Sequence, residues 1–343
     1  MQQSLFESLP TPSTPDRHAA QRWWRLQGAA RRAGRRVEPL LVTPRFVDRI
    51  HSAQCPVTRA PLGPRSAVTV PLRDDAAVAA GHLVTLSPAA AAAAADGGTW
   101  SQAWAVADNL ADGMTNPQGA QVHGLDAAAW RRLAVLRSFV QPLSPAQAAG
   151  LPLLVLPPNR LRVLSPVQGL QVVVTLALQG PDRARRLLQL ARLGPDEDTR
   201  MALRVFVLTL LARCPAYTET LAGPAGRLAL EDLWLDALLQ RRWQRLASRL
   251  TDADALDLLA RARHQRLLGT GWRPLEPGFA VDGWDLPASP GPALKSGHAR
   301  RQALASTTGC ASAVAPRRVA SAVLGAGAGR HGADADPEAA AGH

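Results

Sequence analysis

The sequence has 343 residues, enough for one large or two ordinary domains, and its hydrophobic content of 47% permits a packed core. Its formal net charge is +12, carried by arginine because Lys295 is the only lysine, and such a surplus favours polyanionic partners such as nucleic acid. Three widely spaced cysteines exclude a disulfide framework and a four-cysteine zinc site, and no uninterrupted apolar stretch reaches the ~18 residues that span a bilayer.

An arginine-rich segment from Asp16 to Glu38 follows a start of Ser, Thr and Pro over residues 1–16, which is predicted to be flexible. The segment is predicted to be a helix, with apolar residues on one face and arginines on the opposite face. One interpretation is a helix that contacts phosphates, with Trp24 beside the arginines for stacking. The alternative is the solvated face of a core helix. The arginines that would share the basic face are Arg17, Arg25, Arg31, Arg32 and Arg35.

Residues 51–87 contain a tight turn, a strand and a loop that lead into a helix. The turn is CPVT at residues 55–58, the strand is SAVTVPL, and GHLV precedes a helix start marked by Ser87 and Pro88. The motifs CPVT, DDAAVAAG and HLV resemble those of the HNH-type endonucleases. The resemblance implies a small ββα-metal element made of a β-hairpin, a loop and a helix.

In the HNH family a strand histidine accepts the proton of an attacking water, and further ligands hold a divalent metal at the scissile phosphate. The resemblance places the strand group at Val68 to Val70, where valine neither ligates a metal nor moves a proton. It places the family's helix-side asparagine at His82, which becomes the candidate catalytic group. An alternative divalent-metal site would combine His51, Asp75 and His82. The remaining alternative is a coincidental likeness.

Helices dominate the rest of the pattern. Helices are predicted over 89–95 and 99–110, and the motifs SPAQ (144–147) and SPVQ (165–168) have the form of capping boxes. A leucine stripe on a later amphipathic helix would pack against a core or against a partner, including a second copy of the chain. Its members are Leu235, Leu239, Leu246 and Leu250.

The sequence therefore predicts a mainly α protein, with a helical bundle-like body, a small ββα element near the N-terminus and a disordered C-terminal tail. The predicted parts are 1–16, 17–125, 126–272 and a tail over 273–343. We expect a cytoplasmic, noncatalytic protein that binds nucleic acid, with no membrane contact and no required cofactor. A helical scaffold and a divalent-metal-dependent endonuclease are the two alternative functions.

Overall fold

The computed structural model describes residues 16–96, 98–112, 121–159, 161–180, 182–214 and 223–267. All of them belong to the first of two units, residues 1–296, into which the chain divides. Residues 1–15 of the predicted flexible start and the whole predicted tail over 273–343 lie outside the described residues.

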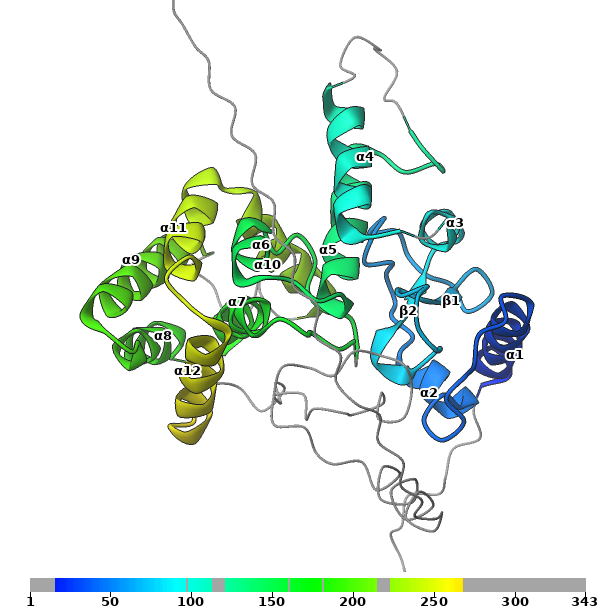
Figure 1. Ribbon diagram of the computed structural model, residues 1–343, viewed down its shortest axis with the longest axis horizontal. Helices are drawn as coiled ribbons and strands as arrows, with labels where there is room; N and C mark the ends of the chain where they lie inside the picture. Colours follow the sequence, from blue (N-terminus) through cyan, green and yellow to red (C-terminus); the bar gives the residue numbers. More distant parts are fainter. Residues whose placement is uncertain are drawn as a thin grey trace, which may run out of the picture. The chain divides into compact units, whose positions relative to one another are not determined.

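The described chain is mainly helical, which confirms the predicted fold class (Figure 1). Its first helices are α1 (Arg17–Arg32), α2 (Pro44–Arg49), α3 (Pro88–Ala95), α4 (Trp100–Asp112), α5 (Ala127–Val140) and α6 (Pro145–Gly150). Its later helices are α7 (Pro166–Leu176), α8 (Arg183–Leu190), α9 (Glu197–Arg213), α10 (Gly223–Asp232), α11 (Ala237–Ala247) and α12 (Asp252–His264). No helix among the described residues is both long enough and apolar enough to cross a membrane.

Two short strands interrupt this helical pattern. Strand β1 (Val68–Pro71) pairs antiparallel with β2 (Leu83–Leu86), so that Thr69 faces Thr85 and Val70 faces Val84. A short 3-10 helix, η1 (Ala80–His82), leads into β2, and α3 follows it. The order of strand, strand and helix agrees with the prediction for this segment.

The small sheet separates two hydrophobic clusters because successive side chains of a strand point to opposite faces. Val84 and Leu86 belong to the large core, together with residues of α3, α5 and the later helices. Leu83 belongs to a smaller cluster with Leu26 of α1 and Ile50. The sheet therefore attaches α1 to the helical body.

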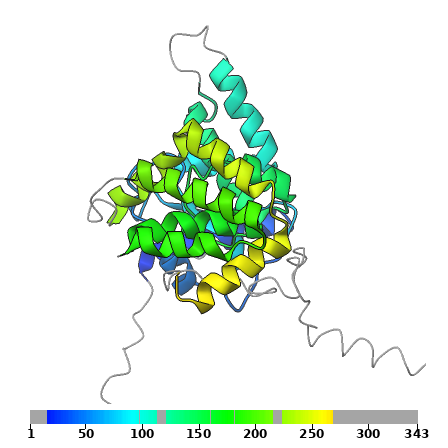
Figure 2. The ribbon, with the colours of Figure 1, turned by 90° about the vertical axis from the view of Figure 1, so that its left-hand side faces the viewer.

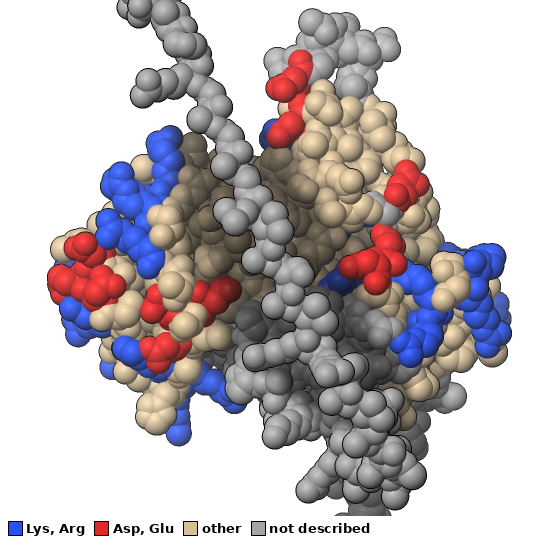
Figure 3. Space-filling model, viewed as in Figure 1, with Lys and Arg blue, Asp and Glu red and all other residues tan. Residues whose placement is uncertain are grey.

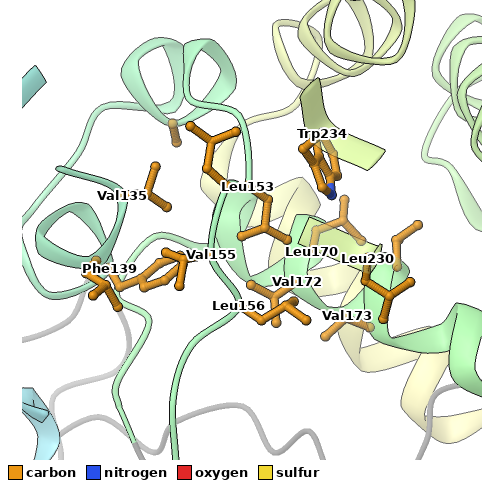
Figure 4. Close-up of a cluster of buried hydrophobic side chains, with 14 of the residues drawn as sticks. Val135, Phe139, Leu153, Val155, Leu156, Leu170, Val172, Val173, Leu230 and Trp234 are labelled. Carbon is orange, nitrogen blue, oxygen red and sulfur yellow. The ribbon is translucent and has the colours of Figure 1, made fainter. Parts of the chain in front are cut away.

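The large core contains residues from Cys55 to Leu267, on both sides of the predicted boundary between residues 125 and 126. At its centre, an extended segment carrying Leu153 and Val155 passes between Phe139 of α5 and Leu170 of α7 (Figure 4). The helices of the body lie side by side around it (Figure 2). Trp234 and Trp243 meet edge to face with ring centroids 5.8 Å apart, a favourable aromatic geometry.

The leucine stripe lies inside this core. Leu239, Leu246 and Leu250 are buried, and α11 packs against α9, whereas Leu235 is 65% exposed. The prediction that the stripe offers a surface to a partner or a second copy is therefore wrong for three of its four leucines. An amphipathic pattern predicts that the apolar face of a helix is buried. It does not show whether that face packs against the same chain or against a partner.

The two predicted capping motifs both begin helices, but only one closes as a full box. In α6 the Ser144 hydroxyl accepts from the Gln147 N–H, and the Gln147 side chain accepts from the Ser144 N–H. In α7 the Ser165 hydroxyl accepts from the Gln168 N–H, but the Gln168 side chain donates instead to Ser138, at 2.8 Å. A buried hydrogen bond to α5 thus replaces half of the box.

A buried carboxylate joins the turn at residues 55–59 to the helical body. Glu231 of α10 is buried; its Oε1 accepts from the Leu156 N–H at 2.9 Å and lies 3.3 Å from the Arg227 Nε. Its Oε2 lies 3.5 Å from the Arg59 guanidinium, which also pairs with the exposed Asp232 at 2.7 Å. Burial raises the pKa of Glu231, and the Leu156 N–H and the arginines oppose that rise.

Candidate nucleic-acid interface

Helix α1 has one face that packs on the chain and one that does not. Ala19, Leu26 and Ala30 are buried at the helical spacing that the sequence predicts. The Trp23 indole is half-buried and donates to the Val42 carbonyl at 2.8 Å. These contacts fix the rotation of α1 about its axis and therefore decide which side chains remain outside.

The outer face of α1 carries four of the five predicted arginines. Arg17, Arg25, Arg31 and Arg32 are exposed, and none of their side chains makes a hydrogen bond or ion pair with another described residue. Arginine side chains gather over α1 at the right edge of the space-filling view (Figure 3). The helix contains no acidic residue, so its outer face is positively charged without internal neutralisation.

Trp24 lies within this basic face. Its side chain is 63% exposed, and it follows Arg17 and precedes Arg31 by seven residues each, a spacing that puts all three on one side of a helix. It meets Trp23 edge to face, with ring centroids 4.8 Å apart. The exposed Trp24 indole therefore lies between arginines and contacts a second indole that is itself hydrogen-bonded to the backbone.

Arg35 is not part of this face, which corrects the prediction. The helix ends at Arg32 because Gly34 has a φ of +64°, a left-handed conformation that favours glycine. Beyond it, the Arg35 side chain turns inward and donates to the Ala76 carbonyl from Nε at 2.9 Å, and also to the Arg73 carbonyl. Its Nη1 lies 3.7 Å from Asp74, so the guanidinium holds the loop between β1 and η1.

A groove runs between α1 and β1. Its volume is about 440 Å³, and its walls come from one side of α1 and from the whole of β1. Arg25, Arg32 and Arg35 line it together with the buried Arg22, and Asp74 is the acidic residue among its lining side chains. The groove and the outer face of α1 therefore share Arg25 and Arg32.

Arg22 is a wall residue that the sequence pattern did not single out. It is only 4% exposed, and it donates from Nη1 to the Pro64 carbonyl at 3.1 Å. Its Nε has no hydrogen-bond partner among the described residues. Burial lowers the pKa of Arg22, and the charges of Asp48 and Asp16 oppose that shift. No residue near it in the sequence signals this burial.

His82, the candidate catalytic group, is committed to the backbone. Its side chain is 2% exposed, and its Nε2 accepts from the Ala79 N–H at 2.8 Å. Burial, followed by the charges of Arg35 and Arg73, lowers the pKa of His82 from 6.5 to about 3. The ring is therefore neutral with its hydrogen on Nδ1, and the lone pair that a metal would need is already in use.

The other two proposed metal ligands lie in different surroundings. Arg73 donates to both carboxylate oxygens of Asp75, at 2.9 Å and 2.5 Å, which lowers the pKa of Asp75. Burial lowers the pKa of His51, whose charged neighbours are Arg22, Asp48 and Asp16. Within the described ranges, no group of three or more His, Cys, Asp or Glu side chains is placed to hold a metal ion. His51, Asp75 and His82 thus do not form such a group, although Asp75 lies near enough to His82 to oppose the lowering of its pKa.

The turn at residues 55–58 serves the start of α3. The Cys55 Sγ accepts from the Ser87 N–H at 3.3 Å, and the hydroxyls of Thr58 and Ser87 lie 3.3 Å apart. Burial alone would raise the pKa of Cys55, but hydrogen bonds from Ser87 and Thr58 outweigh it and lower that pKa. The thiol is buried, so its role here is to position the helix.

The chain matches no protein-family model, no curated protein and no solved structure.

Proposed function

We propose that this protein binds nucleic acid through α1 and does not cleave it. The observation that carries the proposal is the set of four exposed arginines with the exposed Trp24 between them. Arginines supply the salt-dependent contact with phosphates, and an indole supplies stacking on a base. The net charge of +12 adds long-range attraction for a polyanion.

Helix α1 contains no acidic residue, whereas part of the arginine charge on the helical body is neutralised by carboxylates. On the body, Arg200, Arg213 and Arg261 are each paired with a carboxylate within 3 Å. Exposed pairs of this kind contribute little to stability, but they cancel the field of the arginine. The four arginines of α1 have no such partner among the described residues, so this surface retains its attraction for phosphate.

We propose that the protein does not cleave nucleic acid because of the residues at the β1–β2 hairpin. A hydrolytic site needs an accessible base or metal ligand beside the scissile phosphate. The strand offers Val68 and Val70, and His82 is buried with its lone pair engaged. Supercoiled plasmid incubated with the protein and Mg²⁺ or Mn²⁺ is expected to remain intact. Nicking that His82→Asn abolishes would overturn this part of the proposal.

The salt dependence of binding tests the proposed interface. In one variant, Arg17, Arg25, Arg31 and Arg32 become Gln; in its control, the exposed helix arginines Arg204, Arg241, Arg245 and Arg263 become Gln. Both variants lose four charges, and none of the eight arginines has a described side-chain partner. Affinity for a fluorescein-labelled oligonucleotide is measured by anisotropy at several salt concentrations.

We expect the α1 variant to bind weakly and to lose about 3 from the slope of log K against log salt, because each lost phosphate contact removes about 0.7 for a single strand. The control is expected to keep most of the slope. Equal behaviour of the two variants would overturn the proposal, since net charge alone would then explain binding. Matching thermal unfolding curves exclude misfolding as the cause.

A further inference from the structure

We infer that the groove between α1 and β1 accepts one unpaired base of a single strand, while Arg25 and Arg32 contact the phosphates on either side of it. This inference rests on the proposed function, because it names the form of nucleic acid that the same surface binds. It predicts a preference for single strands over duplexes, which the outer face of α1 alone would not produce.

The lining of the groove has two chemical zones. Arg25 and Arg32, seven residues apart on one side of α1, are exposed at its border. The rest of the lining is largely apolar and includes Leu26, Ala29 and Ala33 from α1, and the half-buried Val68 and Val70 from β1, which also pack against the large core. An apolar surface bordered by guanidinium groups suits a planar base that carries a phosphate on each side.

Two buried polar side chains of the groove carry atoms without hydrogen-bond partners among the described residues. Thr69 of β1 is 6% exposed, Arg22 of α1 is also buried, and both line the groove. The Thr69 Oγ1 and the Arg22 Nε have no hydrogen-bond partner among the described residues. Buried polar atoms without partners are costly. Both atoms lie just beneath the lining of the groove, so a base that displaces the lining side chains slightly would supply their partners with its carbonyls, ring nitrogens and amino groups.

Strand β1 adds backbone groups to the same wall. The sheet has two strands, so β1 is hydrogen-bonded to β2 on one edge only, and all four residues of β1 line the groove. An edge strand presents unpaired N–H and C=O groups. These match the donors and acceptors on the edge of a base, which duplex pairing would conceal.

The size of the groove also favours a single unpaired residue. A volume of about 440 Å³ lies within the range of sites that hold one small molecule. The helix wall is held by Leu26 of α1, which shares a hydrophobic cluster with Leu83 of β2, the strand paired with the wall strand β1. A duplex, with its bases stacked and paired, could touch the border arginines but could not enter.

A substitution that fills the groove without changing charge tests the inference. Ala29 is an exposed position of α1 that lines the groove, whereas Gln21 is an exposed position of the same helix that does not. We compare Ala29→Phe with Gln21→Phe, using labelled oligothymidylate of about 12 nucleotides and a duplex of equal length. Anisotropy gives both affinities at one salt concentration.

We expect the unmodified protein to bind the single strand about tenfold more tightly than the duplex. Ala29→Phe should remove this preference and leave duplex affinity unchanged, and Gln21→Phe should preserve it. Equal affinity for both forms, or a preference that survives in Ala29→Phe, would overturn the inference. The proposed function is tested separately by the arginine variants. If it is right, the α1 variant loses affinity for both the single strand and the duplex, whereas Ala29→Phe affects the single strand alone.

A free nucleotide is the other source of the same chemistry. Thymidine monophosphate is added as a competitor against the labelled strand. If thymidine monophosphate displaces the labelled strand only at concentrations far above those at which an unlabelled strand does so, the groove is a site for a strand. Displacement at equal concentrations would show that the groove binds the free nucleotide, and would overturn the assignment to a strand.

Discussion

Thr69 and Thr85 face each other across the small sheet, both are buried, and neither hydroxyl has a hydrogen-bond partner among the described residues. Only Thr69 lines the groove. Valine has nearly the same shape without the hydroxyl, so each Thr→Val change removes a costly polar atom and leaves no cavity. We expect each variant to raise the free energy of unfolding by about 1 kcal/mol in urea titrations.

The variants of Thr69 and Thr85 also distinguish an effect on stability from an effect on binding. Thr69→Val should weaken binding of the single strand by about twofold to tenfold, because it removes a group that the base would contact. Thr85→Val should leave binding unchanged. If Thr69→Val destabilised the protein by 1 kcal/mol or more, the hydroxyl would have a structural partner, and its proposed role in the groove would be wrong.

His82 should make stability depend on pH. Its pKa is about 3 in the folded chain and 6.5 in its ordinary state, so the unfolded chain binds a proton first as the pH falls. Its contribution is therefore complete above pH 6.5 and is lost towards pH 3, at about 1.4 kcal/mol per pH unit.

The check is the free energy of unfolding in urea at several pH values between 7 and 4. His82→Gln, which keeps an acceptor in its side chain, should flatten the decline over this interval. The control is His264→Gln at an exposed position of α12, and it should decline like the unmodified protein. An unchanged decline in His82→Gln would show that other groups cause it.

Glu231 and Asp232 are neighbouring acids that share Arg59 but differ in burial. Glu231→Leu should lower the free energy of unfolding by about 3 kcal/mol, because the Leu156 N–H loses its acceptor and Arg59 and Arg227 lose their buried counter-charge. Asp232→Leu should cost less than about 1 kcal/mol, since its pair with Arg59 is largely solvated. Chemical denaturation of both variants checks this, and equal losses would contradict the role given to burial.

Leu239 and Leu235 test whether the leucine stripe is core or surface. Leu239→Ala should lower the free energy of unfolding by about 2–5 kcal/mol, because it leaves a cavity between α11 and its neighbours. Leu235→Ala should change it by less than about 0.5 kcal/mol, because that side chain is exposed. If Leu235→Ala were destabilised and its mass in solution also fell, an oligomer would have dissociated. That result would indicate that Leu235 lies in an interface between copies of the chain.

Much of the helical fold could be predicted because helix starts depend on local chemistry. Ser144 and Ser165 each accept from the N–H three residues later, as the motifs SPAQ and SPVQ predict. The hairpin was also predictable, since a strand with Val68 and Val70 precedes a loop and a second apolar run.

The candidate site was only half predictable, because it depends on contacts between distant segments. Four arginines of α1 are exposed as expected, but Gly34 ends the helix early and sends Arg35 to carbonyls about forty residues away. The burial of Arg22 beside Pro64 and the engagement of His82 by Ala79 also arise from the loop after β1 and from the residues around it. No local pattern encodes these contacts.

The border of the groove has a further consequence for the behaviour of the protein at high concentration. The outer edge of β1 could align with the same edge of a second molecule and begin a continuous sheet. Arg25 and Arg32 line the same groove as β1, so two molecules approaching in this way would bring like charges together. The same arginines that attract a polyanion thereby discourage aggregation, and a variant that lacks them would be the more prone to precipitate.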